Sequence, residues 1–346
     1  MRAVVYNGVG DFQMVEREVP VILDPKDAVV RVTAASICSS DLHIRDGFVP
    51  RAVPGTVVGH EFVGVVESVG DDVKNVSPGD RVAVNVETYC GECFFCRRGY
   101  VNNCTDPDGG WALGCRIDGG QAEYVRIPYA DNALTPIPDH VSDDMALFTG
   151  DILSTGYWAA DISEIHEGDV VVVIGAGPTG ICCAMCARLK NPSKIVMVEV
   201  REDRRRFVSE HGIADIALDP MSDDICSVIG GLTDGRGADR VMEVAGSRDT
   251  FGMAWGVARP NAIVTIVAMY PGPQVLPLPD MYGKNLTFKT GGVDGCHCDE
   301  IMDLISEGRL DSSILISHEF PFDRIMEAYD LFASGSDGVM KVLIRM

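Results

Sequence analysis

Short runs rich in β-branched residues, separated by glycine and proline turns, fill the first part of the chain. They are AVVYNGVG (3–10), AVVRVTAAS (28–36), FVGVVESVG (62–70) and DRVAVNVE (80–87). Runs of this length and composition are typical of strands. The pattern predicts a compact, largely antiparallel β domain.

After Asp151 the pattern changes. DVVVVI (169–174) is a continuous apolar run, as expected for a parallel strand that is buried on both faces. A helical stretch (181–190) and a second strand (194–200) follow it, and helix and strand patterns then alternate as far as residue 269. This βαβ rhythm predicts a Rossmann-type, doubly wound parallel sheet.

Beyond Val293 the rhythm stops, and two helix patterns and a final strand, KVLIRM (341–346), close the chain. We expect this last segment to return to the first domain. The predicted organisation is therefore a β domain formed by residues 1–153 and 293–346, with a nucleotide-binding domain inserted at 154–292. A chain of 346 residues is long enough for two separate cores.

The net charge of the chain disfavours one class of partner, nucleic acids. The chain has 29 basic and 51 acidic residues, a net charge of −22, which argues against nucleic-acid binding because that requires basic surface. The N-terminus runs straight into a strand pattern and does not resemble a signal peptide. No apolar run approaches the ~20 residues that cross a bilayer. We expect a cytoplasmic protein with no membrane or nucleic-acid partner.

Four cysteines lie in one short stretch, CGECFFCRRGYVNNC. Cys90, Cys93, Cys96 and Cys104 follow the spacing C-x2-C-x2-C-x7-C. Disulfides are disfavoured because cytosolic thiols are kept reduced. The iron–sulfur run has a shorter last spacing and a proline after it, whereas Thr105 follows here. Incidental cysteines are the remaining alternative. The spacing indicates a closed, structural zinc site with four thiolate ligands.

A glycine-rich motif lies between the strand 169–174 and the helix that follows it. Gly175, Gly177 and Gly180 form G-x-G-x-x-G, with Pro178 and Thr179 inside the loop. In this context the motif predicts a dinucleotide site whose pyrophosphate lies at the helix N-terminus.

Glu199 ends the second strand of the same unit. A carboxylate at this place bonds the ribose hydroxyls and repels a 2′-phosphate, which favours NAD as the cofactor. Arg201 and the basic run at 204–206 keep NADP open as the alternative, since they could instead bind its phosphate.

Cys38, His60 and Glu61 are natural ligands for a borderline-soft divalent cation. A lone histidine is more often structural, but His60 lies in the specific motif G-H-E-x2-G-x5-G at 59–70.

Two further groups of cysteines lie later in the chain. The cysteines of the helix after the glycine loop, Cys182, Cys183 and Cys186, are expected to be small buried apolar residues. The run Cys296–His297–Cys298 resembles a ligand cluster but has no other ligand candidate near it in sequence, and it stays unassigned.

Taken together, these motifs resemble the zinc-containing medium-chain dehydrogenase/reductase family, the family of the zinc alcohol dehydrogenases, over essentially the whole chain. The matching pieces occur in the order of that family: C-x-x-D-x-H (38–43), G-H-E-x2-G-x5-G (59–70), P-G-D-R-V (78–82), the four cysteines (90–104), S-T-G (154–156) and G-x-G-x-x-G (175–180). The resemblance implies a GroES-like catalytic domain and two zinc ions per chain, one catalytic and one structural.

The resemblance also implies roles in the catalytic zinc site. Cys38 and His60 match two ligands, and Asp151, just before the S-T-G turn, matches the third. Glu61 matches an exchangeable fourth ligand, and Asp41 a carboxylate that orients His60. An Asp in the third position is similar to the bacterial tetrameric secondary-alcohol branch, so a tetramer or a dimer is expected.

Other positions match residues near the substrate and the cofactor. Ser40 matches the hydroxyl that touches the substrate oxygen, and His43 the imidazole that exchanges its proton with solvent. Thr155 would lie beside the nicotinamide. The strand end whose backbone bonds the carboxamide matches Val267, Ala268 and Met269.

Two side chains have less specific matches. Trp111 is either a pocket wall or a packing aromatic, and Lys341 would pair with Glu61 once that carboxylate leaves the metal.

The predicted function is hydride transfer between an alcohol, secondary or primary, and NAD. One alternative is a polyol, sugar or threonine-type dehydrogenase with the same zinc and NAD, for which Glu87 is a candidate hydroxyl binder. A second is a catalytically silent nucleotide-binding protein, which would be expected to lack the three zinc ligands.

Overall fold

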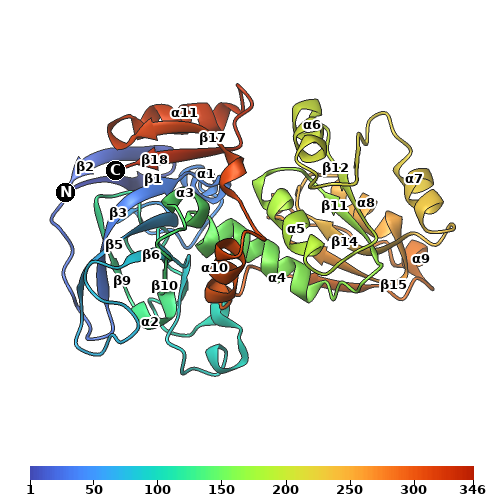
Figure 1. Ribbon diagram of the computed structural model, residues 1–346. Helices are drawn as coiled ribbons and strands as arrows, with labels where there is room; N and C mark the ends of the chain where they lie inside the picture. Colours follow the sequence, from blue (N-terminus) through green and yellow to red (C-terminus); the bar gives the residue numbers. More distant parts are fainter. The chain divides into compact units, whose positions relative to one another are not determined.

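The structure is a computed structural model that describes residues 1–346. The chain forms two compact units, and no sheet is shared between them (Figure 1). Unit 1 consists of Met1–Ser154 and Asp294–Met346, and unit 2 of Thr155–Val293. No helix is long and apolar enough to cross a membrane.

Unit 1 is built on three sheets that are almost entirely antiparallel. In the largest, β18 pairs with β3, so the C-terminal strand completes a sheet begun near the N-terminus (Figure 1). Its order is β10 (Leu134–Pro136), β6 (Arg81–Val84), β5 (Glu61–Val69), β3 (Ala28–Ser36), β18 (Lys341–Arg345) and β17 (Ile316–Pro321), with β9 (Tyr124–Ile127) also on β3. The smaller sheets are β2 (Asp11–Glu16), β1 (Arg2–Gly8) and β4 (Thr56–Val57), and the pair β7 (Glu87–Thr88) and β8 (Gly110–Trp111).

The core of unit 1 lies on one face of the large sheet. Val30, Val32 and Phe62 point into it from β3 and β5, and Phe322 and Tyr329 enter it from the C-terminal segment. Burial of such side chains is worth about 2 kcal/mol each relative to exposure. The C-terminal segment is therefore held by apolar packing as well as by strand pairing.

Short helices and turns connect these strands. The helices are α1 (Ser39–Arg45), α2 (Ala130–Ala133), α3 (Asp143–Ala146), α10 (Cys298–Ser306) and α11 (Ile325–Ser334). The turns are η1 (Cys96–Arg98), η2 (Val101–Asn103), η4 (Ser313–Leu315), η5 (Phe322–Arg324) and the π-helical turn η3 (Thr149–Leu153).

Unit 2 is a six-stranded parallel sheet. The strand order is β13 (Ile216–Leu218), β12 (Lys194–Val198), β11 (Val170–Ile174), β14 (Ala238–Glu243), β15 (Ala258–Ile266) and β16 (Thr287–Thr290). In chain order this is 3-2-1-4-5-6, the order of dinucleotide-binding sheets. The helices are α4 (Ser154–Ile162), α5 (Pro178–Arg188), α6 (Glu202–Glu210), α7 (Ile225–Leu232), α8 (Thr250–Val257) and α9 (Leu278–Met281).

The apolar run of β11 is buried along its whole length, as its sequence predicted. Cys182, Cys183 and Cys186 of α5 are buried too, which confirms that they act as small apolar residues in this helix. Burial raises the pKa of Cys183 to about 12, so this thiol is inert at neutral pH.

Candidate active site

Three predicted ligands from separate parts of unit 1 come together. Cys38 precedes α1 at the end of β3, His60 directly precedes β5, and Asp151 lies in the π-helical turn η3. Gly59 has φ +91° and a Cβ there would lie 2.4 Å from Gln121 Cγ, so only glycine lets the chain present His60 in this way. One sulfur, one nitrogen and one oxygen atom of the three side chains lie within 4.8 Å of one another.

The spacing of these atoms fits a metal ion. Asp151 Oδ2 is 3.3 Å from His60 Nε2 and 3.6 Å from Cys38 Sγ. Ligands bound tetrahedrally to zinc at its usual bond lengths are about 3.3 to 3.8 Å apart. Sulfur, imidazole and carboxylate are also the donors that zinc accepts. The three residues therefore suit a zinc ion with an open fourth position.

The electrostatics of the site favour a positive charge. Burial alone would lower the pKa of His60, but Asp41 and Asp151 raise it well above its usual value. Burial would raise the pKa of Asp151, yet His60 and Lys341 hold it below its usual range. The arrangement therefore calls for a cation among these groups, which either a proton or a metal ion can supply.

A relay of buried polar groups orients His60. Its Nδ1 lies 3.1 Å from Asp41 Oδ1, which leaves Nε2 facing Cys38 and Asp151. The other oxygen of Asp41 accepts hydrogen bonds from the Cys38 N–H (2.9 Å) and from Gln121 Nε2 (3.3 Å). Gln121 Oε1 accepts a bond from the Tyr329 hydroxyl (2.7 Å). Partners of this kind fix the orientation of metal-binding histidines.

Glu61 does not belong to the group of three. Its carboxylate pairs with Lys341, whose ammonium also donates to the Ile37 carbonyl (3.2 Å). Burial raises the pKa of Glu61 to about 7, although Lys341 acts in the opposite direction. The expected pairing of Glu61 with Lys341 is present, and Glu61 is not one of the three converging side chains.

Ser40 and Trp111, two further residues singled out in the sequence, lie beside the same centre. Ser40 Oγ lies 3.5 Å from Cys38 Sγ, and the ring of His43 contacts Phe48 edge-on. Trp111 packs edge-on against His60, with ring centroids 5.6 Å apart. Trp111 therefore packs directly against one of the three converging side chains.

The sequence did not single out Arg51. Its guanidinium lies 4.8 Å above the ring of Trp111. The pairing depends on a loop contact, Val53 N–H to the Cys115 carbonyl (2.9 Å), that no local pattern signals.

The four-cysteine lobe forms a second group of ligand atoms. Its Sγ atoms lie 3.4 Å (Cys93 to Cys96), 3.6 Å (Cys104 to Cys90) and 3.9 Å (Cys90 to Cys96) apart. These distances are far longer than a disulfide bond, whereas four sulfurs around zinc are about 3.8 Å apart. The N–H groups of Glu92 and Cys96 donate to the sulfur atoms of Cys90 and Cys93, and the bond from Cys96 lowers the pKa of Cys93 to about 5.

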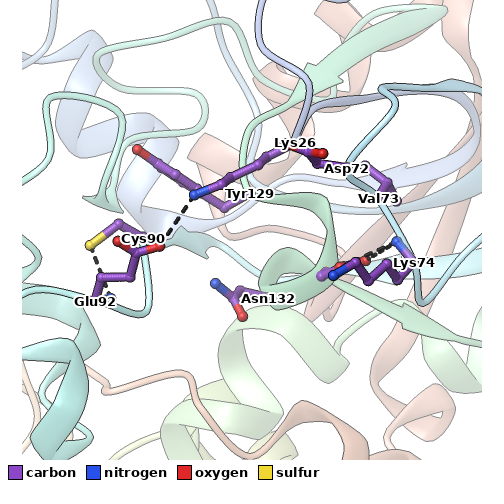
Figure 2. Close-up of a pocket in the computed structure, with 9 residues that line it drawn as sticks. Lys26, Asp72, Val73, Lys74, Cys90, Glu92, Tyr129 and Asn132 are labelled. Atoms are coloured by element: carbon purple, nitrogen blue, oxygen red, sulfur yellow. Dashed lines mark hydrogen bonds and ion pairs between the residues drawn. The ribbon is translucent and has the colours of Figure 1, made fainter.

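A cavity of about 390 Å³ opens beside this lobe (Figure 2). Its walls are Lys26, Asp72, Val73, Lys74, Cys90, Glu92, Tyr129, Asp131 and Asn132. Lys26 Nζ pairs with Glu92 Oε1 at 3.3 Å, and Asp131 accepts a bond from the Lys74 N–H at 2.9 Å. The cavity borders the four-cysteine site and contains none of the three converging ligands.

In unit 2 the glycine loop follows β11 and leads into α5. Pro178 and Thr179 open the helix, and Gly177 precedes it. A Cβ at Gly180 would lie 2.0 Å from the Gly175 carbonyl oxygen, so the turn closes only with glycine there. The loop thus has the tight strand-to-helix geometry that dinucleotide sites require.

Glu199 is fixed at the end of β12 by two backbone bonds. Its oxygens accept hydrogen bonds from the N–H groups of Ala176 (2.8 Å) and Arg201 (2.9 Å). Arg201 pairs with Asp203 at 2.7 Å, and Arg204 Nη1 lies 3.9 Å from Glu199. Arg201 and Arg204 therefore both lie close to carboxylates.

The strand end at 267–269 is tied to β14. The N–H groups of Val267 (2.9 Å) and Ala268 (3.2 Å) both donate to the Glu243 carbonyl, while Met269 is exposed. These two N–H groups are therefore already hydrogen-bonded within the protein. The buried side chain of Glu243 also accepts bonds from the Ala245 and Gly246 N–H groups, both 2.9 Å, a role that the sequence did not reveal.

Thr155 is the first residue of unit 2 and lies in α4. Glu87, the candidate hydroxyl binder, is buried, and its Oε2 accepts a hydrogen bond from the Gly295 N–H at 2.7 Å. Burial raises its pKa well above the usual range. The carboxyl group is thus enclosed and hydrogen-bonded within unit 1.

Known proteins match the whole chain. The family model described as alcohol dehydrogenase GroES-like domain matches residues 24–139, and zinc-binding dehydrogenase matches 178–306. An alcohol dehydrogenase of Cupriavidus necator is 33% identical across 100% of this chain and 98% of its own length. The NADP-dependent isopropanol dehydrogenase of Thermoanaerobacter brockii is 29% identical over 99% of each chain. The solved alcohol dehydrogenase TADH from Thermus sp. ATN1 has a TM-score of 0.91 and 33% identity, covering 100% of this chain and 99% of that one.

The chain therefore belongs to the zinc-containing medium-chain dehydrogenase/reductase family, the family of the zinc-type alcohol dehydrogenases. It is an oxidoreductase of the alcohol dehydrogenase type. The predicted family and the predicted fold class, a GroES-like domain with a Rossmann-type domain, are confirmed.

Replacing one ligand in each group should remove one zinc ion at a time. We expect about two zinc ions per native chain and about one in either Asp151→Asn or Cys93→Ser, because a tetrahedral site that loses a donor binds zinc far more weakly. Elemental analysis of protein dialysed against a mild chelator measures this.

Cys226→Ser is the matched control, because its thiol is exposed and belongs to neither group. It should retain two zinc ions. A full zinc content in Asp151→Asn would contradict the assignment of this residue.

Proposed function

We propose that the protein is a zinc-dependent dehydrogenase that oxidises secondary alcohols to ketones with NAD⁺ and catalyses the reverse reduction. The observation that carries the proposal is the convergence of Cys38 Sγ, His60 Nε2 and Asp151 Oδ2 at zinc-ligand spacing. A dinucleotide loop in unit 2 accompanies it. All three ligands are present, which argues against a catalytically silent relative.

Cys38, His60 and Asp151 would hold the catalytic zinc, and the four-cysteine lobe a structural one. A zinc ion held there would supply Lewis-acid chemistry towards a hydroxyl or carbonyl oxygen, and bound NAD⁺ would supply the hydride acceptor. The protein side chains must then bind the alcohol, exclude water and carry one proton away. Ser40 Oγ, which lies 3.5 Å from Cys38 Sγ, would accept the hydroxyl proton and release its own.

His43 passes this proton to solvent in the proposed route. It lies on α1, three residues beyond Ser40, and imidazole groups exchange protons readily with water near neutral pH. The pairing of Glu61 with Lys341 would keep this carboxylate away from the three ligand atoms. Asp41 holds His60 in the orientation that presents Nε2.

A substrate panel tests this function. We expect the highest kcat/KM for 2-propanol or 2-butanol with NAD⁺, and values at least about tenfold lower for sorbitol, galactitol and threonine. The reason is that enclosure of Glu87 removes the polar group proposed to bind further hydroxyls. Reduction of NAD⁺ followed by absorbance gives the comparison.

With the best alcohol, His43→Gln should lower kcat about tenfold and displace its pH profile, because proton transfer is slowed. Asp151→Asn should abolish turnover. If sorbitol or threonine had the highest kcat/KM of the panel, the proposed substrate class would be wrong. Full turnover in Asp151→Asn would contradict the zinc mechanism.

The cofactor preference follows from Glu199. Its carboxylate stands at the end of β12, fixed by the backbone of Ala176 and Arg201. Three of the nearby basic side chains are paired with acids: Arg201 with Asp203, Arg204 with Glu199 and Arg205 with Asp219. A carboxylate repels the 2′-phosphate of NADP, which supports NAD.

Glu199→Gln should reduce the preference for NAD⁺ over NADP⁺. We expect the ratio of kcat/KM for NAD⁺ to that for NADP⁺ to fall by about tenfold or more, because one repulsive charge is removed. The control is Glu202→Gln, the next carboxylate along the chain, which lies in the first turn of α6. An unchanged ratio in Glu199→Gln would contradict the assignment.

We also propose that the chain forms a dimer or a tetramer. One segment of unit 2 exposes an unusual run of apolar side chains: Val275 (78% exposed), Leu276 (49%), Leu278 (67%) and Tyr282 (93%). This segment leads into β16, an edge strand of the sheet. Exposed apolar patches beside an open sheet edge mark association surfaces.

The double substitution Leu278→Asp with Tyr282→Asp should shift the protein towards monomers, because two charges would enter the contact. Light scattering after size exclusion measures the mass. Leu23→Asp, at an equally exposed leucine of unit 1 (73%), should leave the assembly unchanged. A native protein of 37.3 kDa in solution would refute association.

A further inference from the structure

The indole of Trp111 joins an arginine to the candidate metal site. The guanidinium of Arg51 lies 4.8 Å from the centre of the indole ring, and the ring of His60 packs edge-on against the same indole, with centroids 5.6 Å apart. A guanidinium held over an aromatic ring is attracted through its charge, so its N–H donors stay free to bind an anion. Arg51 is thus a positioned cation one side chain away from a zinc ligand.

The charge of Arg51 is exposed and has no carboxylate partner in the chain. The acids of the neighbouring loops pair with other arginines, Asp46 with Arg45 at 2.9 Å and Asp118 with Arg17 at 3.7 Å. In a chain of net charge −22, this leaves a local positive charge close to the metal site that an anion can neutralise.

Backbone hydrogen bonds fix the loop that carries Arg51. The Ala52 N–H donates to the Val49 carbonyl at 3.0 Å, and the Val53 N–H donates to the Cys115 carbonyl at 2.9 Å. Val49 and Cys115 are both buried. The guanidinium is therefore presented from an anchored turn, and a binding group that is ordered in advance loses less entropy when a ligand binds.

Trp111 adds a second donor that lacks an acceptor. Its Nε1–H is buried and has no hydrogen-bond partner within the protein. Buried donors are almost always hydrogen-bonded, so a donor without a partner in the chain indicates a partner outside it. A carboxylate fits both observations, because it is negatively charged and only accepts hydrogen bonds.

Apolar side chains lie in the same loop as Arg51. Phe48 is 62% exposed and Val53 is 45% exposed. Phe48 also contacts the ring of His43 edge-on, so this apolar surface extends to the residue proposed to carry the proton. Such a surface suits a hydrocarbon chain that joins a hydroxyl at the metal site to a charge at Arg51.

We propose that Arg51 and Trp111 form a subsite for a carboxylate, and that the preferred substrate is a hydroxy acid with several carbons between its secondary hydroxyl and its carboxylate. The inference rests on the proposed function and names the substrate class of the same site. The spacing follows because the guanidinium contacts the metal site only through the indole ring. Threonine does not meet this requirement, since its carboxylate lies close to the hydroxyl and is accompanied by an ammonium. One guanidinium matches the single charge of a carboxylate, whereas a phosphate dianion would need a second cation.

The test measures kcat/KM with NAD⁺ on the zinc-loaded protein for 4-hydroxypentanoate and 5-hydroxyhexanoate, each compared with its uncharged amide. We expect at least one acid to exceed its amide about tenfold, because only the acid gains a charge-assisted hydrogen bond to Arg51. The preference should shrink as the ionic strength rises, since Arg51 is exposed to solvent.

Variants of Arg51 separate a binding role from a structural one. Arg51→Gln should lower the ratio of kcat/KM for the acid to that for the amide about tenfold, through a higher KM for the acid and with little change in kcat. Arg51→Lys should give an intermediate ratio, because it keeps the charge but loses the planar guanidinium. The matched control is Arg97→Gln, at another exposed arginine of unit 1, which should keep the native ratio.

The possible outcomes distinguish this inference from the proposed function. If neither acid exceeds its amide, or if Arg51→Gln keeps the native ratio, the carboxylate subsite is wrong although the amides and 2-butanol are still oxidised. If the acids, the amides and 2-butanol all fail to reduce NAD⁺, the proposed function is wrong and the inference falls with it.

Discussion

The arrangement of unit 1 depends on one electrostatic constraint, the need for a cation among a buried thiol, an imidazole and a carboxylate. Asp151 Oδ2 stands 3.3 Å from His60 Nε2 and 3.6 Å from Cys38 Sγ, on elements that are distant in sequence. Isolated buried charges are costly, so a group of donors at this spacing is stable only around a positive charge. The relay from Tyr329 through Gln121 and Asp41 fixes the imidazole for that purpose.

The same constraint explains the position of Lys341. This buried lysine from the last strand pairs with Glu61, the acidic neighbour of His60. Without it, a third carboxylate near the centre would be uncompensated, and burial already raises the pKa of Glu61 to about 7. The pairing of β18 with β3 therefore completes the charge balance of the site as well as the sheet.

Much of this could be predicted from local sequence. The apolar run of β11, the glycine loop and the cysteine spacing each reflect short-range rules, and these elements formed where expected. The sequence did not predict strands β13 and β16, because three residues (IAL) and a polar run (TFKT) show no strand pattern. Both segments form strands by pairing with a neighbouring strand of the sheet. The contact of Arg51 with Trp111 and the enclosure of Glu87 likewise depend on segments that meet only in the folded chain.

Anomalous diffraction from zinc-soaked crystals, collected on both sides of the zinc absorption edge, tests the central claim most directly. We expect one peak bonded to Cys38 Sγ, His60 Nε2 and a carboxylate oxygen of Asp151, at about 2.0 to 2.3 Å from each. A zinc peak confined to the four-cysteine lobe, with Asp151 turned away from His60, would contradict the account.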